Sequence, residues 1–198
     1  MRSLTMLVSA AALLALVATG GGQEKKGGKK GGGIQLPPMI HIQIADFPDG
    51  GHIPSKYTCA AGPMSPSPAI NWSGAPANTQ SYTLIMHDPD PVLGGSATND
   101  VLHWAIFDIP GDAKGLPEGV KPGDQADGAK QIKNIAMQNA YLGPCPPQGH
   151  GDHHYTLELY ALNAKLNLPD SASRSELMNA MNGKVIAKGV YIGMFGQK

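Results

Sequence analysis

Hydrophobic and polar residues alternate along several short stretches of the chain. In residues 40–44 three isoleucines are separated by a histidine and a glutamine, and residues 81–86 and 155–161 show the same period of two. Such alternation is typical of half-buried strands. Residues 101–109 form a nearly continuous apolar run that predicts a central strand, and residues 190–195 predict a final one.

Near the C-terminus the pattern changes to that of a helix. Ser173 and Glu176 are spaced as in a capping box, in which each side chain bonds a backbone N–H of the other residue. Leu177 and Met181 then fall on one helical face, and Gly183 is placed to end the helix. Strands dominate without regular strand–helix alternation, so the sequence predicts an all-β fold: an antiparallel β-sandwich with one or two short flanking helices.

The composition fits such a fold and narrows the range of partners. The 198 residues include 26 glycines and 17 prolines, which suits short strands joined by many turns. The formal net charge is zero, so the chain lacks the broad basic character of a nucleic-acid-binding protein. We therefore expect no nucleic-acid partner.

The first residues have the pattern of a targeting segment. Arg2 precedes an apolar run over residues 6–18, and small residues follow, as in a secretory signal. The run is shorter than the roughly 20 residues that span a bilayer, with an uncleaved anchor as the alternative. We expect a signal peptide at 1–22, a flexible glycine- and lysine-rich linker at 23–38 and the folded domain at 39–198. The protein is then exported, periplasmic or extracellular, and keeps no stable membrane span after signal cleavage.

The chain has two cysteines, Cys59 and Cys145. Export permits a disulfide between them. Their positions in the sequence do not show whether their Cα atoms lie within the roughly 7 Å that a bridge requires. A disulfide and a pair of small buried thiols therefore remain as the two alternatives.

Polar residues gather at the edges of two predicted strands. Asp88 lies in a proline-stiffened turn, and His103 lies inside an apolar strand, where a buried imidazole needs a partner. We expect Asp88 to pair with His103 and raise its pKa. A cationic His103 then holds a phosphate-like anion, with the Tyr155 hydroxyl as a further donor. The alternatives are a simple turn, a core histidine and a packing tyrosine.

Two ordered motifs include these residues, and shorter matching stretches precede them. The motifs are Asp88-Pro89-Asp90-Pro91 with His103-Trp104, and Gly143-Pro144-Cys145-Pro146-Pro147 with His153-His154-Tyr155 and Leu159-Tyr160-Ala161-Leu162; upstream lie Ile53-Pro54, Tyr57-Thr58-Cys59 and Ser67-Pro68-Ala69-Ile70-Asn71-Trp72. From about residue 40 onwards the chain resembles the phosphatidylethanolamine-binding protein family, especially its bacterial Raf kinase inhibitor-like branch.

The resemblance implies a Greek-key β-sandwich with a pocket for a phosphate-like anion, such as a phosphorylated small molecule or a phospholipid headgroup. It also implies that the protein regulates a protein partner, as a kinase- or protease-inhibitor-like module. Asp88, His103 and Tyr155 match the core of the pocket. The other matching residues are Asp90, Gly143, Cys145 and His153 as lining, with Pro91 and Trp104 as walls.

The chain departs from the family pattern at three positions. Pro91 directly follows Asp90, where the family has one more residue between them. Leu102 stands where a tryptophan is common, which predicts a softer or wider pocket wall. His154 stands where the family often has arginine, so less fixed charge is expected at the rim.

A non-catalytic binding protein without a cofactor is the leading interpretation. A hydrolase is the first alternative, with His103 as general base oriented by Asp88, but the chain contains no Gly-x-Ser-x-Gly motif for a nucleophile. A metal-binding protein is the second alternative. Its ligands would come from the cluster of His150, Asp152, His153 and His154.

Overall fold

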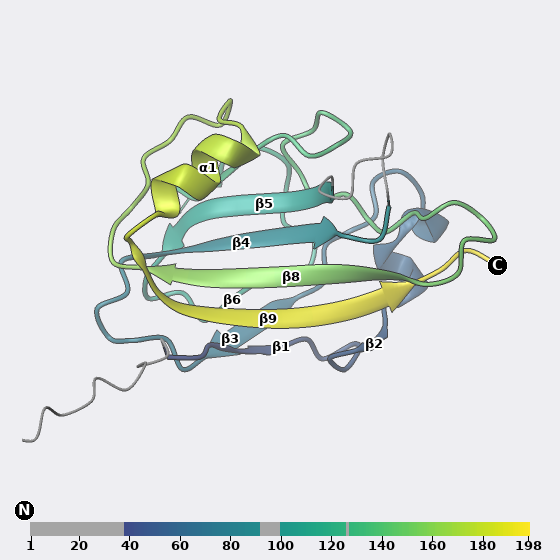
Figure 1. The fold of residues 1–198 in the computed structure, drawn as a ribbon, viewed down its shortest axis with the longest axis horizontal. Helices are drawn as coiled ribbons and strands as arrows, with labels where there is room; N and C mark the ends of the chain where they lie inside the picture. Colours follow the sequence, from purple (N-terminus) through teal and green to yellow (C-terminus); the bar gives the residue numbers. More distant parts are fainter. Residues whose placement is uncertain (1–37, 92–99, 126) are drawn as a thin grey trace, which may run out of the picture. The chain divides into compact units, whose positions relative to one another are not determined.

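The computed structural model describes residues 38–91, 100–125 and 127–198. The expected signal peptide and all but the last residue of the expected linker lie outside this range. The described residues form two β-sheets with one α-helix, so the all-β fold with a short flanking helix is confirmed (Figure 1). Within these ranges no helix is long and apolar enough to cross a membrane.

The larger sheet has six strands and supplies most of the core. Its order is β2 (Gly51–His52), β9 (Val185–Phe195), β8 (His153–Leu162), β4 (Ser81–Asp88), β5 (Val101–Pro110) and β7 (Lys130–Gln131). The pairings are antiparallel except that of β2 with β9, which is parallel. Strand β9 is longer than its apolar pattern predicts, because it follows β8 along its whole length.

A smaller sheet covers one face of the larger one. Its order is β1 (His41–Gln43), β3 (Ile70–Ser73) and β6 (Gly115–Leu116). Two short 3₁₀ helices, η1 (Ser55–Tyr57) and η2 (Cys59–Ala61), precede β3. Ile70 and Trp72 of the small sheet belong to the same buried cluster as Leu84, Trp104 and Leu157 of the large sheet. This cluster is the core of the sandwich.

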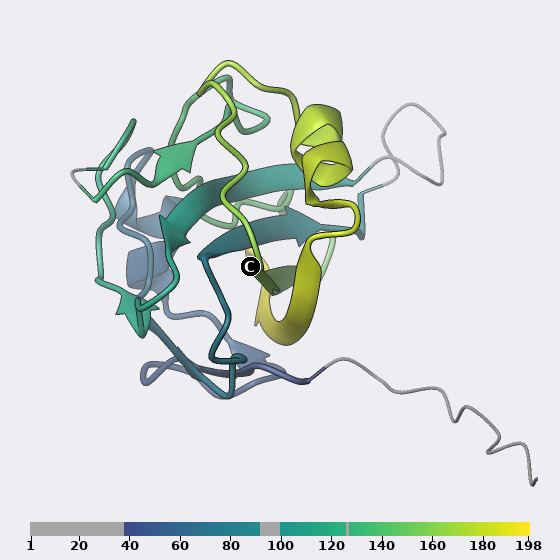
Figure 2. The ribbon, with the colours of Figure 1, turned by 90° about the vertical axis from the view of Figure 1, so that its left-hand side faces the viewer.

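Helix α1 (Arg174–Met181) packs on the opposite face of the large sheet (Figures 1 and 2). The predicted capping box is present, because the Ser173 hydroxyl accepts from the Glu176 backbone and the Glu176 carboxylate accepts from the Ser173 backbone. Leu177 and Met181 join a second buried cluster with Phe107 of β5. The amphipathic pattern therefore predicted both the helix and its buried face.

A β-bulge interrupts the pairing of β4 with β5. Met86 pairs with Trp104 and His87 pairs with Leu102, so His103 is an extra residue on β5. An extra residue shifts the alternation of side chains by one position. His103 and Trp104 consequently both face the sandwich core, whereas Leu102 packs with the cluster beneath α1. The bulge therefore positions a histidine at the end of an otherwise apolar strand.

Candidate functional site

A cavity of about 260 Å³ lies where β4 ends, β5 begins and β8 begins. The loop that precedes β8 closes one side of it. Its lining residues are Asp88, Pro91, Val101, His103, Ile135, Leu142, Gly143, Cys145, Pro146, Pro147, His153 and Tyr155. The structure thus brings together seven of the nine residues that the sequence assigned to the pocket.

Asp88 pairs with His153, which corrects the expected pairing with His103. The Nδ1 atom of His153 lies 2.8 Å from Oδ2 of Asp88, and both side chains are buried. Oδ1 of the same carboxylate accepts from the backbone N–H of Asp90 at 3.0 Å. An ionised carboxylate only accepts, so His153 carries its proton on Nδ1. This leaves Nε2 of His153 for other contacts.

His103 bonds the backbone instead of a carboxylate. Its Nδ1 donates to the carbonyl of Leu142 at 3.0 Å, and no described residue bonds its Nε2. Burial lowers the pKa of His103, and the Leu142 carbonyl and the charge of Asp88 offset this effect only in part. The expected rise in its pKa was therefore wrong, because desolvation outweighs a carboxylate that bonds elsewhere.

Tyr155 has a buried hydroxyl without a partner. The residue is fully buried, and its ring meets that of His103 edge-on with centroids 5.1 Å apart. Its hydroxyl forms no hydrogen bond of good geometry with a described residue, and the Asp88 carboxylate and the Cys145 backbone lie near it. Burial raises the pKa of Tyr155, and the charge of Asp88 adds to the rise, so the hydroxyl stays protonated. A buried polar group without a partner is costly and calls for an explanation, such as a ligand.

Two predicted pocket residues lie elsewhere. Trp104 does not line the cavity, because the bulge turns it into the core, where its Nε1 donates to Oε1 of Gln131 at 2.6 Å. Asp90 stays at the surface beside the cavity, and its carboxylate accepts from Nδ1 of His154 at 3.0 Å. Leu102 forms no wall of the cavity either, so the expected softening at that position does not arise.

The loop that closes the cavity is fixed at two points. Cys59 and Cys145 form a disulfide with Cα atoms 5.3 Å apart, and the Cys59 N–H donates to the carbonyl of Pro144 at 3.0 Å. A Cβ atom on Gly143 would lie 2.3 Å from the Ser65 hydroxyl and 2.6 Å from the Tyr57 carbonyl. Only glycine permits this close approach of the loop to η1.

The residues of the alternative metal site do not have the spacing of metal ligands, although the rings of His150 and His153 lie 6.1 Å apart. Asp152 pairs with His52 at 2.8 Å, His154 pairs with Asp90, and His153 is buried against Asp88. Among the described residues, one group has the spacing of metal ligands, and it consists of Asp88, Asp90 and His153 with ligand atoms within 4.8 Å of one another. Two of these three side chains already bond each other, as a structural pair would.

Sequence reasoning missed several apolar residues of the lining. Val101, Ile135, Leu142, Pro146 and Pro147 surround the polar groups. Val101 lies on the same side of β5 as His103 by the ordinary alternation of a strand, so that signal was present in the sequence. Ile135 comes from a distant loop, and no local pattern connects it to the cavity.

The sequence and the fold both resemble those of known proteins. The sequence model of a family described as "Phosphatidylethanolamine-binding protein" matches residues 43–196. A UPF0098 protein of Aquifex aeolicus is 39% identical over 150 residues, which cover 75% of this chain and 84% of the relative. The putative lipoprotein LppC of Mycobacterium tuberculosis is 31% identical over 75% of this chain and 68% of its own length. The crystal structure of Escherichia coli YbcL superposes with a TM-score of 0.70 at 25% identity, over 80% of this chain and 99% of YbcL.

Proposed function

This chain belongs to the phosphatidylethanolamine-binding protein family, and we propose that its cavity binds a phosphate-like anion without transforming it. The observation that carries the proposal is the buried, unpartnered hydroxyl of Tyr155 beside the Nε2 atom of His103. Both atoms belong to residues that line one small cavity. An anion there would give the hydroxyl an acceptor in good geometry.

Protons are part of the proposed binding event. With Nδ1 bonded to Leu142, a neutral His103 has only a lone pair on Nε2, so it donates to an anion only as the imidazolium. Burial keeps it neutral in the free protein, because the pKa of His103 is lowered. The negative charge of a ligand favours the imidazolium and raises that pKa again. Anion binding is therefore expected to take up a proton at Nε2.

Asp88 has a positioning role in this account. Its carboxylate repels an anion, but the hydrogen bond to His153 fixes the orientation of that imidazole. His153 lines the cavity as well, and its Nε2 is a second position from which a donor can reach the ligand when the ring is charged. The cavity of about 260 Å³ suits a small group, such as inorganic phosphate, a phosphomonoester or the headgroup of a phospholipid.

Binding without chemistry is favoured over hydrolysis by the state of Cys145. It is the cysteine of the lining, and its sulfur is in a disulfide, so it supplies no thiolate nucleophile. The described lining contains no serine, threonine or lysine. A nucleophilic mechanism requires such a group within hydrogen-bond reach of His103.

We further propose that the protein is exported. A disulfide persists in oxidising compartments such as the periplasm, and Cys59–Cys145 is bridged. The related LppC is a putative lipoprotein, which fits the same side of a membrane. Fractionation of cells that express the full chain, with mass spectrometry of the mature N-terminus, tests this proposal. An intact Met1 in the cytoplasmic fraction would contradict it.

Calorimetric titration with phosphate and phosphorylethanolamine tests the proposed binding. His103→Ala and Tyr155→Phe each remove one donor, and a hydrogen bond to a charged group contributes about 1.5–3 kcal/mol, so roughly 10- to 100-fold weaker binding is expected. His52→Ala is the matched control, since His52 is exposed and pairs with Asp152 outside this cavity. Equal affinities in all four proteins would refute the assignment of the site.

A further inference from the structure

A second small cavity lies at the other end of strand β4 from the anion cavity. It has a volume of about 150 Å³ and lies where β3 ends, β4 begins and β6 begins. Its lining residues are Trp72, Ser73, Gly74, Ala75, Tyr82 and Lys114. Tyr82 is the second residue of β4 and Asp88 is its last, so the geometry of a strand separates the two cavities by roughly 20 Å (Figure 1). Among the described residues, none lines both cavities.

Trp72 contributes a buried donor without a partner to this cavity. The residue is 4% exposed, and its Nε1 atom forms no hydrogen bond with a described residue. The other tryptophan of the chain, Trp104, is also buried, but its Nε1 donates to Oε1 of Gln131 at 2.6 Å. A buried N–H without a partner is costly and calls for an explanation. Because the indole nitrogen only donates, a partner for it must be an acceptor.

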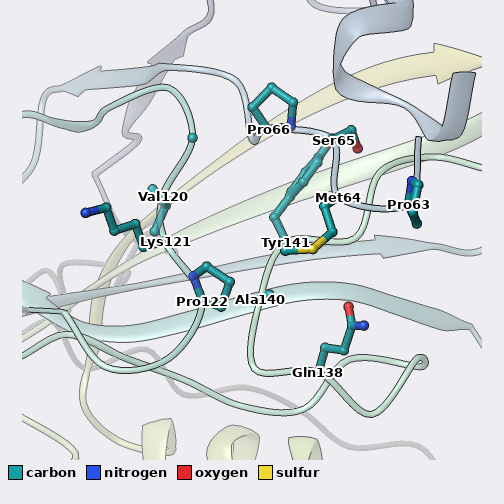
Figure 3. Close-up of a pocket in the computed structure, with 11 residues that line it drawn as sticks. Pro63, Met64, Ser65, Pro66, Val120, Lys121, Pro122, Gln138, Ala140 and Tyr141 are labelled. Atoms are coloured by element: carbon teal, nitrogen blue, oxygen red, sulfur yellow. The ribbon is translucent and has the colours of Figure 1, made fainter. Parts of the chain in front are cut away.

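The larger cavity drawn in Figure 3 has no such donor. Its volume is about 440 Å³, and Met64, Val120 and three prolines form much of its lining. Its buried hydroxyl, that of Tyr141, donates to the carbonyl of Tyr57 at 2.8 Å. The unpartnered indole nitrogen therefore distinguishes the smaller cavity as the one that has a ligand-binding group to spare.

Lys114 adds a positive charge to the same cavity. The backbone N–H of Trp72 donates to the Lys114 carbonyl at 2.9 Å, which holds the two residues side by side. Lys56 and Lys188 are the lysines that form ion pairs within the described ranges, so Lys114 has no carboxylate partner there. An ammonium group also only donates. The cavity thus combines two donors of which one is charged, and a small anion is the ligand that suits both.

The remaining walls of the cavity are mainly aromatic and apolar. The rings of Trp72 and Tyr82 lie 5.2 Å apart at an angle of 57°, and both residues are buried. Ala75 packs against the same core cluster. Such walls favour a ligand whose charge lies at one end and whose other end is a short hydrocarbon group.

We infer that this cavity binds a compact monocarboxylate of about two to four carbon atoms. One carboxylate group offers two oxygens, which match the Trp72 N–H and the Lys114 ammonium, and the hydrocarbon end lies against the two rings. A cavity of about 150 Å³ has room for about six non-hydrogen atoms, the number in butyrate. The inference is independent of the proposed function, because the residues involved are different.

The two indole N–H signals test the inference within one spectrum. In ¹H–¹⁵N spectra at pH 7.5, acetate, propionate and butyrate should each move the indole signal of Trp72 saturably. The signal of Trp104 should stay in place, because its N–H already has an acceptor. Affinity should rise up to about fourfold for each methylene that is buried against the rings. If none of the three carboxylates moved the Trp72 signal saturably, the inference would be overturned.

Inorganic phosphate distinguishes this cavity from the anion cavity. Phosphate should leave the Trp72 indole signal in place, and butyrate should bind with the same affinity with and without saturating phosphate. A Trp72 signal that phosphate moved as far as butyrate does would overturn the assigned ligand class. Competition between phosphate and butyrate would place the carboxylate in the anion cavity instead.

Substitution of each donor tests its part in the site. Trp72→Phe keeps an aromatic ring and removes the N–H, so calorimetry should show roughly 10- to 100-fold weaker butyrate binding. Lys114→Gln removes an exposed charge and should weaken binding up to about fivefold. Lys133→Gln is the matched control, since Lys133 is exposed and lies outside the cavity, and it should bind butyrate as the wild type does. Wild-type affinity in both Trp72→Phe and Lys114→Gln would refute the site.

Discussion

The imidazole of His153 donates to the carboxylate of Asp88 at 2.8 Å inside the protein. The histidine and aspartate that follow closely in the sequence, His154 and Asp90, form the same kind of pair at the protein surface. His154 and Asp90 approach within 3.0 Å, with side chains 51% and 35% exposed. The two pairs have the same chemistry and nearly the same place in the sequence. They differ in their access to water, and this difference permits a matched comparison.

Asp88→Ala should destabilise the fold much more than Asp90→Ala. The first leaves a buried imidazole donor without a partner, which costs about 1–3 kcal/mol. The second breaks an exposed pair, which contributes about 0–1 kcal/mol. Urea unfolding of both variants measures the difference. Equal losses would show that burial does not set the strength of the Asp88–His153 pair.

Anion affinity should rise as the pH falls. Burial lowers the pKa of free His103, and a bound anion raises it, so one proton is taken up at a pH between the two pKa values. Sulfate, whose charge is constant in this range, should then bind up to about tenfold more tightly per pH unit on going from pH 8 towards pH 5.5. Below the pKa of the free protein the gain should level off.

The variant His103→Gln shows whether His103 or another titrating group causes the pH dependence of anion binding. Asp88, His153 and His87 all lie near enough to influence the charge of His103. If His103 is the group that takes up the proton, the glutamine variant should bind sulfate weakly and almost independently of pH. A variant that retained the wild-type slope would assign the proton to another of these side chains.

Reduction of the disulfide should weaken both the fold and the site. Cys59–Cys145 links residues 86 positions apart, and loss of such a bridge costs about 2–4 kcal/mol. Cys145 lies in the loop that closes the cavity, so the anion should also bind less tightly. Thermal unfolding and phosphate titration with and without reductant measure the two effects. The double variant Cys59→Ser/Cys145→Ser should have the stability and anion affinity of the reduced protein. Adding reductant should change neither of them.

Gly143→Ala should perturb the same loop by steric overlap. The added methyl group meets the Tyr57 carbonyl and the Ser65 hydroxyl well inside contact distance, which predicts a loss of about 1–3 kcal/mol together with weaker anion binding. Gly50→Ala is the control, because no atom lies within 4 Å of its Cβ and only its φ of 73° is unfavourable. That variant should lose about 1 kcal/mol and keep its anion affinity. If Gly143→Ala bound the anion as tightly as the wild type, the position of this loop would not affect anion binding.

Local patterns were sufficient to predict the main elements. The period of two placed the strands around residues 81–86 and 155–161, and the capping box placed helix α1, because these features depend on neighbours in the sequence. Of the three-stranded sheet only β1 was predicted, from the alternation over residues 40–44. Strands β3 and β6 were missed, because they are four and two residues long and too short for a period to be recognised.

The partners within the site required the three-dimensional structure. Asp88 and His153 are 65 positions apart, and nothing in the sequence distinguishes His153 from His103 as the partner of the carboxylate. The sequence also gives no signal for the bulge at His103. Because of this bulge, Trp104 lies in the core and not in the wall of the cavity. The side-chain types of the site were therefore predictable, whereas their pairing and their pKa shifts were not.

The most direct test of the proposed binding follows the imidazole nitrogens during an anion titration. Long-range ¹H–¹⁵N NMR spectra report the protonation state of each histidine. With saturating sulfate at pH 6.5, His103 should change from the neutral ring protonated on Nδ1 to the imidazolium, while the exposed His52 should remain unchanged. If sulfate bound saturably and the ¹⁵N chemical shifts of His103 did not change, the proposed uptake of a proton by His103 would be wrong.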